Sequence, residues 1–319
     1  MKKIKNMAKA ILSIFLLCIL IFSAERVRTS CFDALLICGR LIIPALFPFL
    51  VLSAFITKLG IPGIFGRLIY PLAGRLYGIS PYGASAMVMG FVGGYPTGAA
   101  YIASLEAEEL ISADEGERLI AFCNNSGPAF IIGVMGLGVF HSAKTGLILY
   151  ASHICSALIT GLLFREKAKK FPIPQNHLDD AETSKTIVAA VKQAVSSIIN
   201  ICGFVICFSV LIAIMDSGNN LTLICNKLSQ ISSLEPQFFR VLLSGFLEIG
   251  SGSAEMSGLS PTPFNLALSA AMLGWGGLSV HFQTLAVLSG SKIKGSLHIA
   301  GRLSSAAIAF IMMYIVAAF

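Results

Sequence analysis

Charged side chains are scarce in this chain of 319 residues, because Asp, Glu, Lys and Arg together make up only 12% of it. Soluble globular domains carry about twice that share. Hydrophobic residues make up 55% of the chain and its mean hydropathy is +0.82. This composition excludes an ordinary soluble domain and predicts an all-α polytopic membrane protein in the cell membrane.

The sequence also lacks the residue spacings that hold metals or perform catalysis. Its eight cysteines include no Cys-x-x-Cys pair and lie almost entirely within apolar runs, where cysteine behaves as a small hydrophobic residue. No nucleotide-binding loop, metal-spaced His/Glu set or nucleophile motif occurs. We therefore expect no disulfide framework, no metal, no cofactor and no enzymatic activity.

The net charge of +7 does not indicate a nucleic-acid partner. The lysines and arginines lie mostly in short connectors between apolar segments, as the positive-inside rule predicts, and not as a stripe on a soluble face. The expected partners are the lipid bilayer and a small polar solute or ion. Homo-oligomerisation stays open.

Helix breakers interrupt two apolar segments in the first half of the chain. Residues Gly90 to Gly98 read Gly-Phe-Val-Gly-Gly-Tyr-Pro-Thr-Gly, and residues Asn124 to Pro128 read Asn-Asn-Ser-Gly-Pro. In lipid, an unpaired amide or carbonyl costs several kcal/mol, so irregular backbone persists only where it is buried in protein or lines a wet cavity. Both breaks are thus predicted to form walls of a polar site.

The second half repeats the same order of parts: a long span, an interfacial segment, a Gly-rich re-entrant hairpin, a span broken by small residues and a closing span. Its breaks are predicted within residues Gly245 to Ser253 and Gly274 to Gly277. Three spans and one hairpin give each repeat an odd number of crossings, so the two repeats should be inverted. Inverted repeats whose broken helices meet near the midplane are a transporter architecture.

The chain is expected to divide into four parts with about seven spans in total. These parts are an N-terminal span resembling a signal anchor (1–30), the first repeat (31–164), a basic linker (165–187) and the second repeat (188–319). Basic flanks place the N-terminus and the linker in the cytoplasm, and the C-terminus outside. Two alternatives stay open: a cleaved signal peptide ending at Ala24, and a full crossing in place of the first hairpin.

Polar residues at the breaks are the candidate ligands of the solute. Glu248 lies within a membrane segment and is expected to bind the solute, carry a proton or bind a cation; alternatively, its carboxylate caps a helix N-terminus. Residues Asn124 to Ser126 either bind a neutral polar solute or satisfy the backbone of the broken helix. His281 lies mid-span, one turn beyond Gly277. The candidate substrate-binding residues are Gly90, Gly94, Pro96, Gly98, Asn124, Asn125, Ser126, Gly127, Glu248, Gly250, Gly252, Ser253, Gly274, Gly276, Gly277 and His281.

Two further polar residues, His153 and Arg302, occupy equivalent positions in the two repeats. For both we expect either snorkelling toward the interface or hydrogen bonds between helices.

Three motifs resemble a known family. They are Gly-Phe-x-x-Gly-x-Pro-x-Gly at 90–98, Ala-Phe-Cys-Asn-Asn-Ser-Gly-Pro at 121–128 and Gly-Phe-Leu-Glu-Ile at 245–249. Together they are similar to the YlbJ-type sporulation integral membrane proteins of spore-forming Firmicutes, within the wider nucleoside-recognition or gate-domain families. The resemblance covers nearly the whole chain. It implies a multi-pass membrane protein that moves a nucleoside-like solute or an ion during spore formation, or else a non-transporting scaffold for assembly of the spore envelope (cortex or coat).

Overall fold

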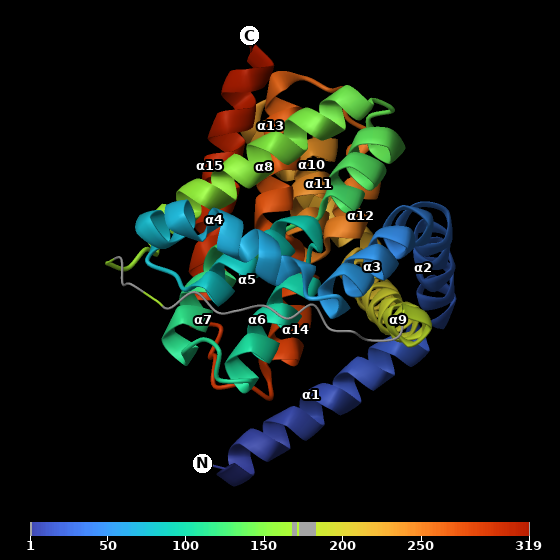
Figure 1. The fold of residues 1–319 in the computed structure, drawn as a ribbon. Coiled ribbons are helices and arrows are strands. Elements are labelled where there is room, and N and C mark those ends of the chain that lie inside the picture. The colour runs from blue at the N-terminus through green and yellow to red at the C-terminus, as the bar shows by residue number, and fades with distance from the viewer. Residues whose placement is uncertain (1, 168–170, 172–182, 319) are drawn as a thin grey trace.

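The computed structural model describes residues 2–167, 171 and 183–318, and this part of the chain is helical with no strand. Figure 1 shows the helices in chain order. The first half contains α1 (Lys2–Phe22), α2 (Ala24–Ile37), η1 (Cys38–Ile42), α3 (Ile43–Lys58), α4 (Ile61–Tyr77), α5 (Pro81–Val92), α6 (Thr97–Ala107), α7 (Ala113–Cys123), η2 (Ala129–Val139) and α8 (Ala143–Leu163). The second half contains α9 (Thr183–Met215), η3 (Ser217–Asn219), α10 (Asn220–Ser232), α11 (Pro236–Leu247), α12 (Ile249–Met256), α13 (Pro263–Trp275), α14 (Gly277–Leu288) and α15 (Ser296–Ala318).

Within these described ranges, five helical stretches are long and apolar enough to cross a membrane. They are Ala24–Lys58, Ala143–Leu163, Thr183–Met215, Pro263–Leu288 and Ser296–Ala318. The break at Asn124 to Pro128 divides its apolar segment into α7 and η2. The apolar part of α1, Ser13–Phe22, is shorter than a usual span. The chain is therefore an all-α polytopic membrane protein, which confirms the prediction from composition.

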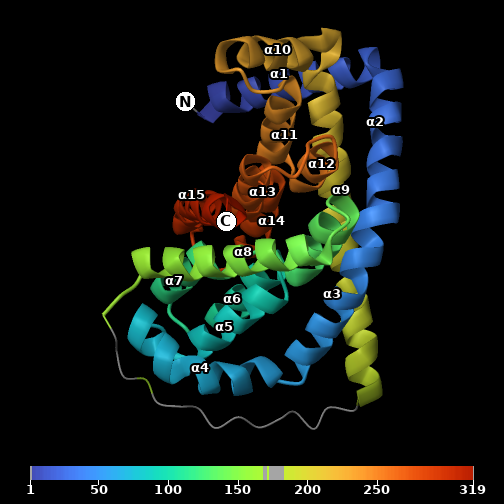
Figure 2. The same ribbon diagram turned by 90° about the horizontal axis from the view of Figure 1, so that it is seen from above.

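The two halves have the same order of elements after their first long helix. Helix α4 precedes the pair α5–α6, the broken helix α7–η2 and α8, whereas α10 precedes the pair α11–α12, the broken helix α13–α14 and α15. Figure 2 shows α4 and α10 at opposite ends of the molecule, with α2, α3 and α9 running between them. Helix α9 packs against both α2 and α3.

Both Gly-rich segments are hairpins whose arms touch. Gly98 faces Gly90, because a Cβ on Gly98 would lie 3.1 Å from the Gly90 Cα. Gly252 faces Gly245 still more closely, with a corresponding distance of 2.3 Å. Each arm has 8 to 12 residues, far fewer than the roughly 20 that a span needs. The first hairpin therefore reverses direction and does not cross in one piece.

The largest buried apolar cluster joins the two halves into one core. Ile131 and Met135 of η2 pack in it with Val241 of α11, Met256 of α12 and Leu273 of α13. This shared core holds the hairpins and the broken helices of both halves against one another.

Candidate functional site

The four breaks meet as two pairs, one in each half. In the first half, a Cβ on Gly94 at the hairpin tip would lie 2.8 Å from the nitrogen of Gly127 in the broken helix. In the second half, a Cβ on Gly277 would lie 2.9 Å from the nitrogen of Ile249 at the other tip. Gly94 and Gly277 have φ values of +70° and +81°, which favour glycine. Both contacts bring backbone against backbone.

Tyr95 joins the two pairs. It follows Gly94 at the first tip, and its ring lies 3.8 Å from where a Cβ on Gly276 would be. Its hydroxyl accepts a 2.6 Å hydrogen bond from the Ser126 hydroxyl. The breaks of both halves therefore surround one centre, as the repeat pattern predicted.

A cavity of about 40 Å³ lies at this centre, which we call the central cavity. Residues of all four breaks or their flanking helices line it, with α3 and α9 closing one side. The volume holds one or two water molecules or a dehydrated ion. Pockets for drug-sized ligands measure roughly 300–1,000 Å³, so a nucleoside does not fit the cavity in this conformation.

Glu248 is the break residue between α11 and α12, and it lines the central cavity. Its side chain is 1% exposed and accepts hydrogen bonds from the backbone N–H groups of Gly250, at 2.8 Å, and Ser251. The carboxylate thus caps the N-terminus of α12, the helix that Glu248 itself precedes. The structure thus shows the capping role, which the sequence offered as one alternative for Glu248, and it also places Glu248 at the cavity.

Two buried polar side chains of α14 face the same cavity. Ser279 and Gln283 lie one turn apart, are 1% and 6% exposed, and both line the cavity. Neither the Ser279 Oγ nor the Gln283 Oε1 forms a hydrogen bond of normal geometry with the residues that the structure describes, although the Ser279 hydroxyl lies close enough to the Glu248 carboxylate to interact with it. Buried polar atoms are normally paired, so these atoms are candidates for contact with a ligand. Sequence reasoning missed both, although a Ser and a Gln four residues apart after a break were a usable signal.

The last carbonyl groups of α7 are capped by side chains from elsewhere, because the break removes their helical partners. Arg302 donates to the Ala121 carbonyl at 3.2 Å, and His298 donates to the Ile120 carbonyl at 3.3 Å. Arg302 also donates to the Asn125 Oδ1 at 3.1 Å. Arg302 is 1% exposed, so it forms interhelical hydrogen bonds and does not snorkel.

The polar residues of the first break also form hydrogen bonds with other parts of the protein. Asn124 accepts from the Ala99 N–H at 3.3 Å and donates to the Thr284 hydroxyl at 2.8 Å. Asn125 donates to the Phe122 carbonyl at 2.7 Å. His153 accepts from the Ser126 N–H at 3.2 Å, so it also bonds between helices. These side chains stabilise the break. Satisfying the backbone of the broken helix was one of the two roles that the sequence offered for residues 124–126.

Only part of the predicted set lies at the cavity. Gly94, Gly127, Glu248 and Gly250 line it. His281 lies behind it, with its ring 4.2 Å from that of Trp275 and 4.8 Å from that of His298. The others pack backbones closely (Gly90, Gly98, Gly252, Gly274, Gly277), end or begin a helix (Gly276, Pro96), or bond to the protein (Asn124, Asn125, Ser126, Ser253).

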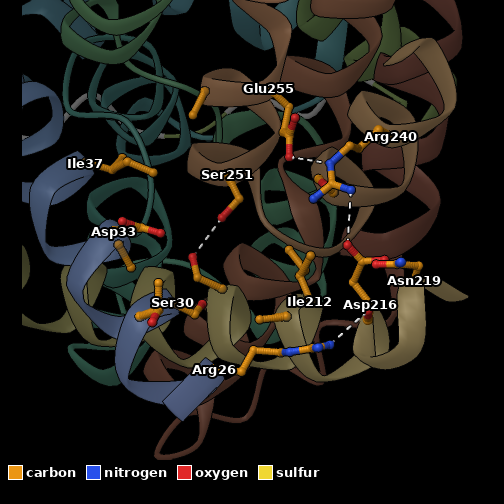
Figure 3. Close-up of a pocket in the computed structure, with 16 residues that line it drawn as sticks. Arg26, Ser30, Asp33, Ile37, Ile212, Asp216, Asn219, Arg240, Ser251 and Glu255 are labelled. Carbon is orange, nitrogen blue, oxygen red and sulfur yellow. Dashed lines mark hydrogen bonds and ion pairs between the residues drawn. The ribbon is translucent and has the colours of Figure 1, made fainter. Parts of the chain in front are cut away.

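A second, open pocket of about 480 Å³ lies between α2, α9, α11 and α12; we call it the α10-side pocket (Figure 3). Arg240 pairs there with Asp216 at 3.2 Å and Glu255 at 2.8 Å. The hydroxyl groups of Ser209 and Ser251 are 2.9 Å apart on its wall. The sequence analysis did not predict this ion-pair network.

Metal chelation by acidic, histidine and cysteine side chains finds no support in the ranges described. No group of three or more such side chains is placed to hold a metal ion there.

Comparison with known proteins gives one informative match. No family model and no solved structure matches the chain. The chain is 29% identical over 280 residues to the sporulation integral membrane protein YlbJ of Bacillus subtilis (strain 168), across 80% of this chain and 69% of that protein. An alignment of that length includes parts of both halves. With the helical membrane fold and the three motifs, this match supports the resemblance of the chain to the YlbJ-type sporulation integral membrane proteins.

Proposed function

We propose that this membrane protein of sporulation is transporter-like and moves a small polar solute or an ion across the membrane. The observation that carries the proposal is the central cavity, where the breaks of both halves meet around Glu248, Ser279 and the unpaired Oε1 of Gln283. An unsatisfied buried polar group costs about 1–3 kcal/mol. A ligand that pairs with these groups would offset that cost, whereas a static scaffold has no use for them.

The proposal includes an orientation for the two halves. Residues 31–164 and 188–319 are inverted repeats in this proposal, and the linker at 165–187 that joins them lies in the cytoplasm. The end of the molecule with α10 and the α10-side pocket then faces outward, and the end with α4 faces the cytoplasm. The positions of α4 and α10 at opposite ends support this arrangement (Figure 2).

The gate-domain resemblance would make the solute nucleoside-like. The size of the central cavity limits whether such a solute can enter it. A cavity of about 40 Å³ admits a solute of that size only after the hairpin tips separate. Movement of the hairpins is therefore part of the proposal for any organic solute, whereas an ion fits the cavity as it stands.

The test compares sporulating cells that carry the wild-type chain, no chain, or Glu248→Gln. We expect Glu248→Gln to match the deletion in an untargeted comparison of spore metabolites and elements, with unchanged membrane levels of the protein. The matched control is Glu235→Gln, an exposed glutamate at the start of the same hairpin, which should match wild type. Normal spores from Glu248→Gln, together with defective spores when Arg165 and Lys167 are replaced, would instead favour a scaffold in envelope assembly.

A further inference from the structure

The geometry points to a binding site for one small monovalent cation in the central cavity, with Glu248 as its anionic ligand and Ser279 and Gln283 as neutral ligands. The assignment rests on the proposed function, because it names the class of ligand that the same cavity takes.

Charge is the first argument. Glu248 is the one ionisable carboxylate among the cavity-lining residues, and most of its neighbours there are apolar, including Phe49, Leu50 and Phe130. A buried carboxylate without a counter-charge is costly. The N–H groups of Gly250 and Ser251 supply only the partial charge of a helix N-terminus, equivalent to about half a unit. A single positive ion would complete the compensation.

The ligand atoms are the second argument. One turn apart on α14, Gln283 presents a buried and unpaired Oε1, and Ser279 presents a buried Oγ beside the Glu248 carboxylate. Together with the carboxylate oxygens of Glu248, they offer hard oxygen ligands, which small hard cations prefer. All three residues line the same cavity.

Size and charge together exclude a divalent ion. Ca²⁺ takes six to eight oxygen ligands, and Mg²⁺ keeps several of its waters when bound. The cavity of about 40 Å³ has no room for a hydrated ion of that kind. A dehydrated monovalent cation such as Na⁺ matches both the volume and the single charge of Glu248.

The α10-side pocket offers a route of entry. Ser251 lines that pocket, and its own N–H donates to the Glu248 carboxylate, so the first turn of α12 separates the two spaces. The pocket also favours cations, because its charged side chains are three acidic and two basic: Asp33, Asp216, Glu255, Arg26 and Arg240.

The test measures thermal unfolding of the purified full-length protein in detergent. Choline chloride is replaced stepwise by NaCl or KCl at constant ionic strength. We expect Tm to rise saturably with one or both metal ions, by about 5 °C at roughly 100 times the dissociation constant. Trp275, the only tryptophan of the chain, lies next to the break at Gly276 and should report binding by fluorescence.

Gln283→Leu is the decisive variant. Its amide oxygen has no protein partner, so in choline chloride the variant should be at least as stable as wild type. In NaCl or KCl it should lose the rise in Tm, as should Glu248→Gln if that variant folds without its full cap. Gln193→Leu, at an exposed position of α9, should keep the wild-type response.

Several results would overturn the site: no response to Na⁺ or K⁺, an equal response to choline, a response to Mg²⁺ or Ca²⁺ alone, or a response that persists in Gln283→Leu. Because this readout is binding by purified protein, its failure leaves the transport proposal to the spore comparison. Conversely, a cation response that Gln283→Leu abolishes, combined with normal spores from Glu248→Gln, would keep the site and overturn transport.

Discussion

Individual polar residues at the breaks have one of two roles, and their hydrogen bonds separate the roles. Asn124, Asn125 and Arg302 bond to backbone or side chains of other elements and stabilise the breaks. Ser279 and Gln283 are equally buried but line the central cavity, where the Gln283 Oε1 is unpaired. The first group should matter for folding and the second for ligand binding.

Arg302→Met tests the first role. The substitution leaves the Ala121 carbonyl and the Asn125 Oδ1 without their donor, and each unsatisfied buried group costs about 1–3 kcal/mol. It also removes the positive charge beside the C-terminal end of α7. We expect a clear fall in Tm and in membrane levels.

The matched control is Arg28→Met, at an exposed position of α2, which should leave Tm unchanged. An Arg302→Met protein with the Tm of wild type would show that Arg302 does not hold the break.

At this scale the sequence predicted residue types better than their contacts. It singled out Glu248 correctly as a buried break residue, because a carboxylate in an apolar segment is visible locally. It did not predict that Arg302 would reach Asn125, since those residues are 177 positions apart and only the packing of α15 on α7 brings them together. Tyr95 lay within a recognised motif, yet its position between the two halves depends on tertiary structure.

Several helices in this protein end at glycine or proline, and some helix ends are capped from distant parts of the chain. Glu117 of α7 accepts from the Gly295 N–H at 2.7 Å and the Ser296 hydroxyl at 3.2 Å, at the start of α15. Trp275 of α13 donates to the Phe246 carbonyl at the end of α11, at 2.9 Å. The break positions could be predicted because Gly and Pro act locally. The caps could not, because they join distant elements.

Gly277→Ala tests whether the close contact between the second tip and its broken helix is required. Gly277 has a φ of +81°, and a Cβ would lie 2.9 Å from the Ile249 nitrogen. The left-handed conformation alone costs an L-residue roughly 1–2 kcal/mol, and the contact adds to it. We expect a lower Tm and loss of the cation response.

Gly203→Ala is the control, because Gly203 lies within α9 with no atom within 4 Å of the added Cβ. Alanine is favoured over glycine in a helix by up to about 1 kcal/mol, so this variant should be slightly more stable than wild type. Equal stability of both variants would contradict the proposed packing of the breaks.

In the whole molecule, α4 and α10 lie at opposite ends and the central cavity lies where the breaks meet. This arrangement predicts the topology of the chain in the membrane. We expect reporter fusions after Lys169, Asn219 and Phe319 to report inside, outside and outside; Lys169 and Phe319 lie beyond the residues that the structure describes. Basic flanks and the proposed inversion of the halves give the reason. A reporter at Asn219 on the same side as Lys169 would contradict the inversion.

The general architecture could be predicted from the sequence. The composition predicted membrane-spanning helices, and the order of the breaks predicted the shared order of elements in the two halves. Five of the expected spans are confirmed as helices of sufficient length and hydropathy in the described part of the chain. The volume of the central cavity was not accessible, since it depends on how α3 and α9 close against the hairpins. That volume decides between an ion and a larger solute in this conformation.

The most direct test of the account is the accessibility of Ser279→Cys in a variant whose eight native cysteines are replaced. Ser279 lines the central cavity, and cysteine is close to serine in size, so cysteine should fit there. In sealed vesicles, we predict modification by a small impermeant thiol reagent from each side of the membrane, slowed by Na⁺. Ser269→Cys, buried in α13 where the native hydroxyl bonds to the Asn265 carbonyl, should stay unmodified. Transport of any solute requires the cavity to open to each side of the membrane in turn, so modification of Ser279→Cys from one side only, or from neither, would contradict the transport proposal.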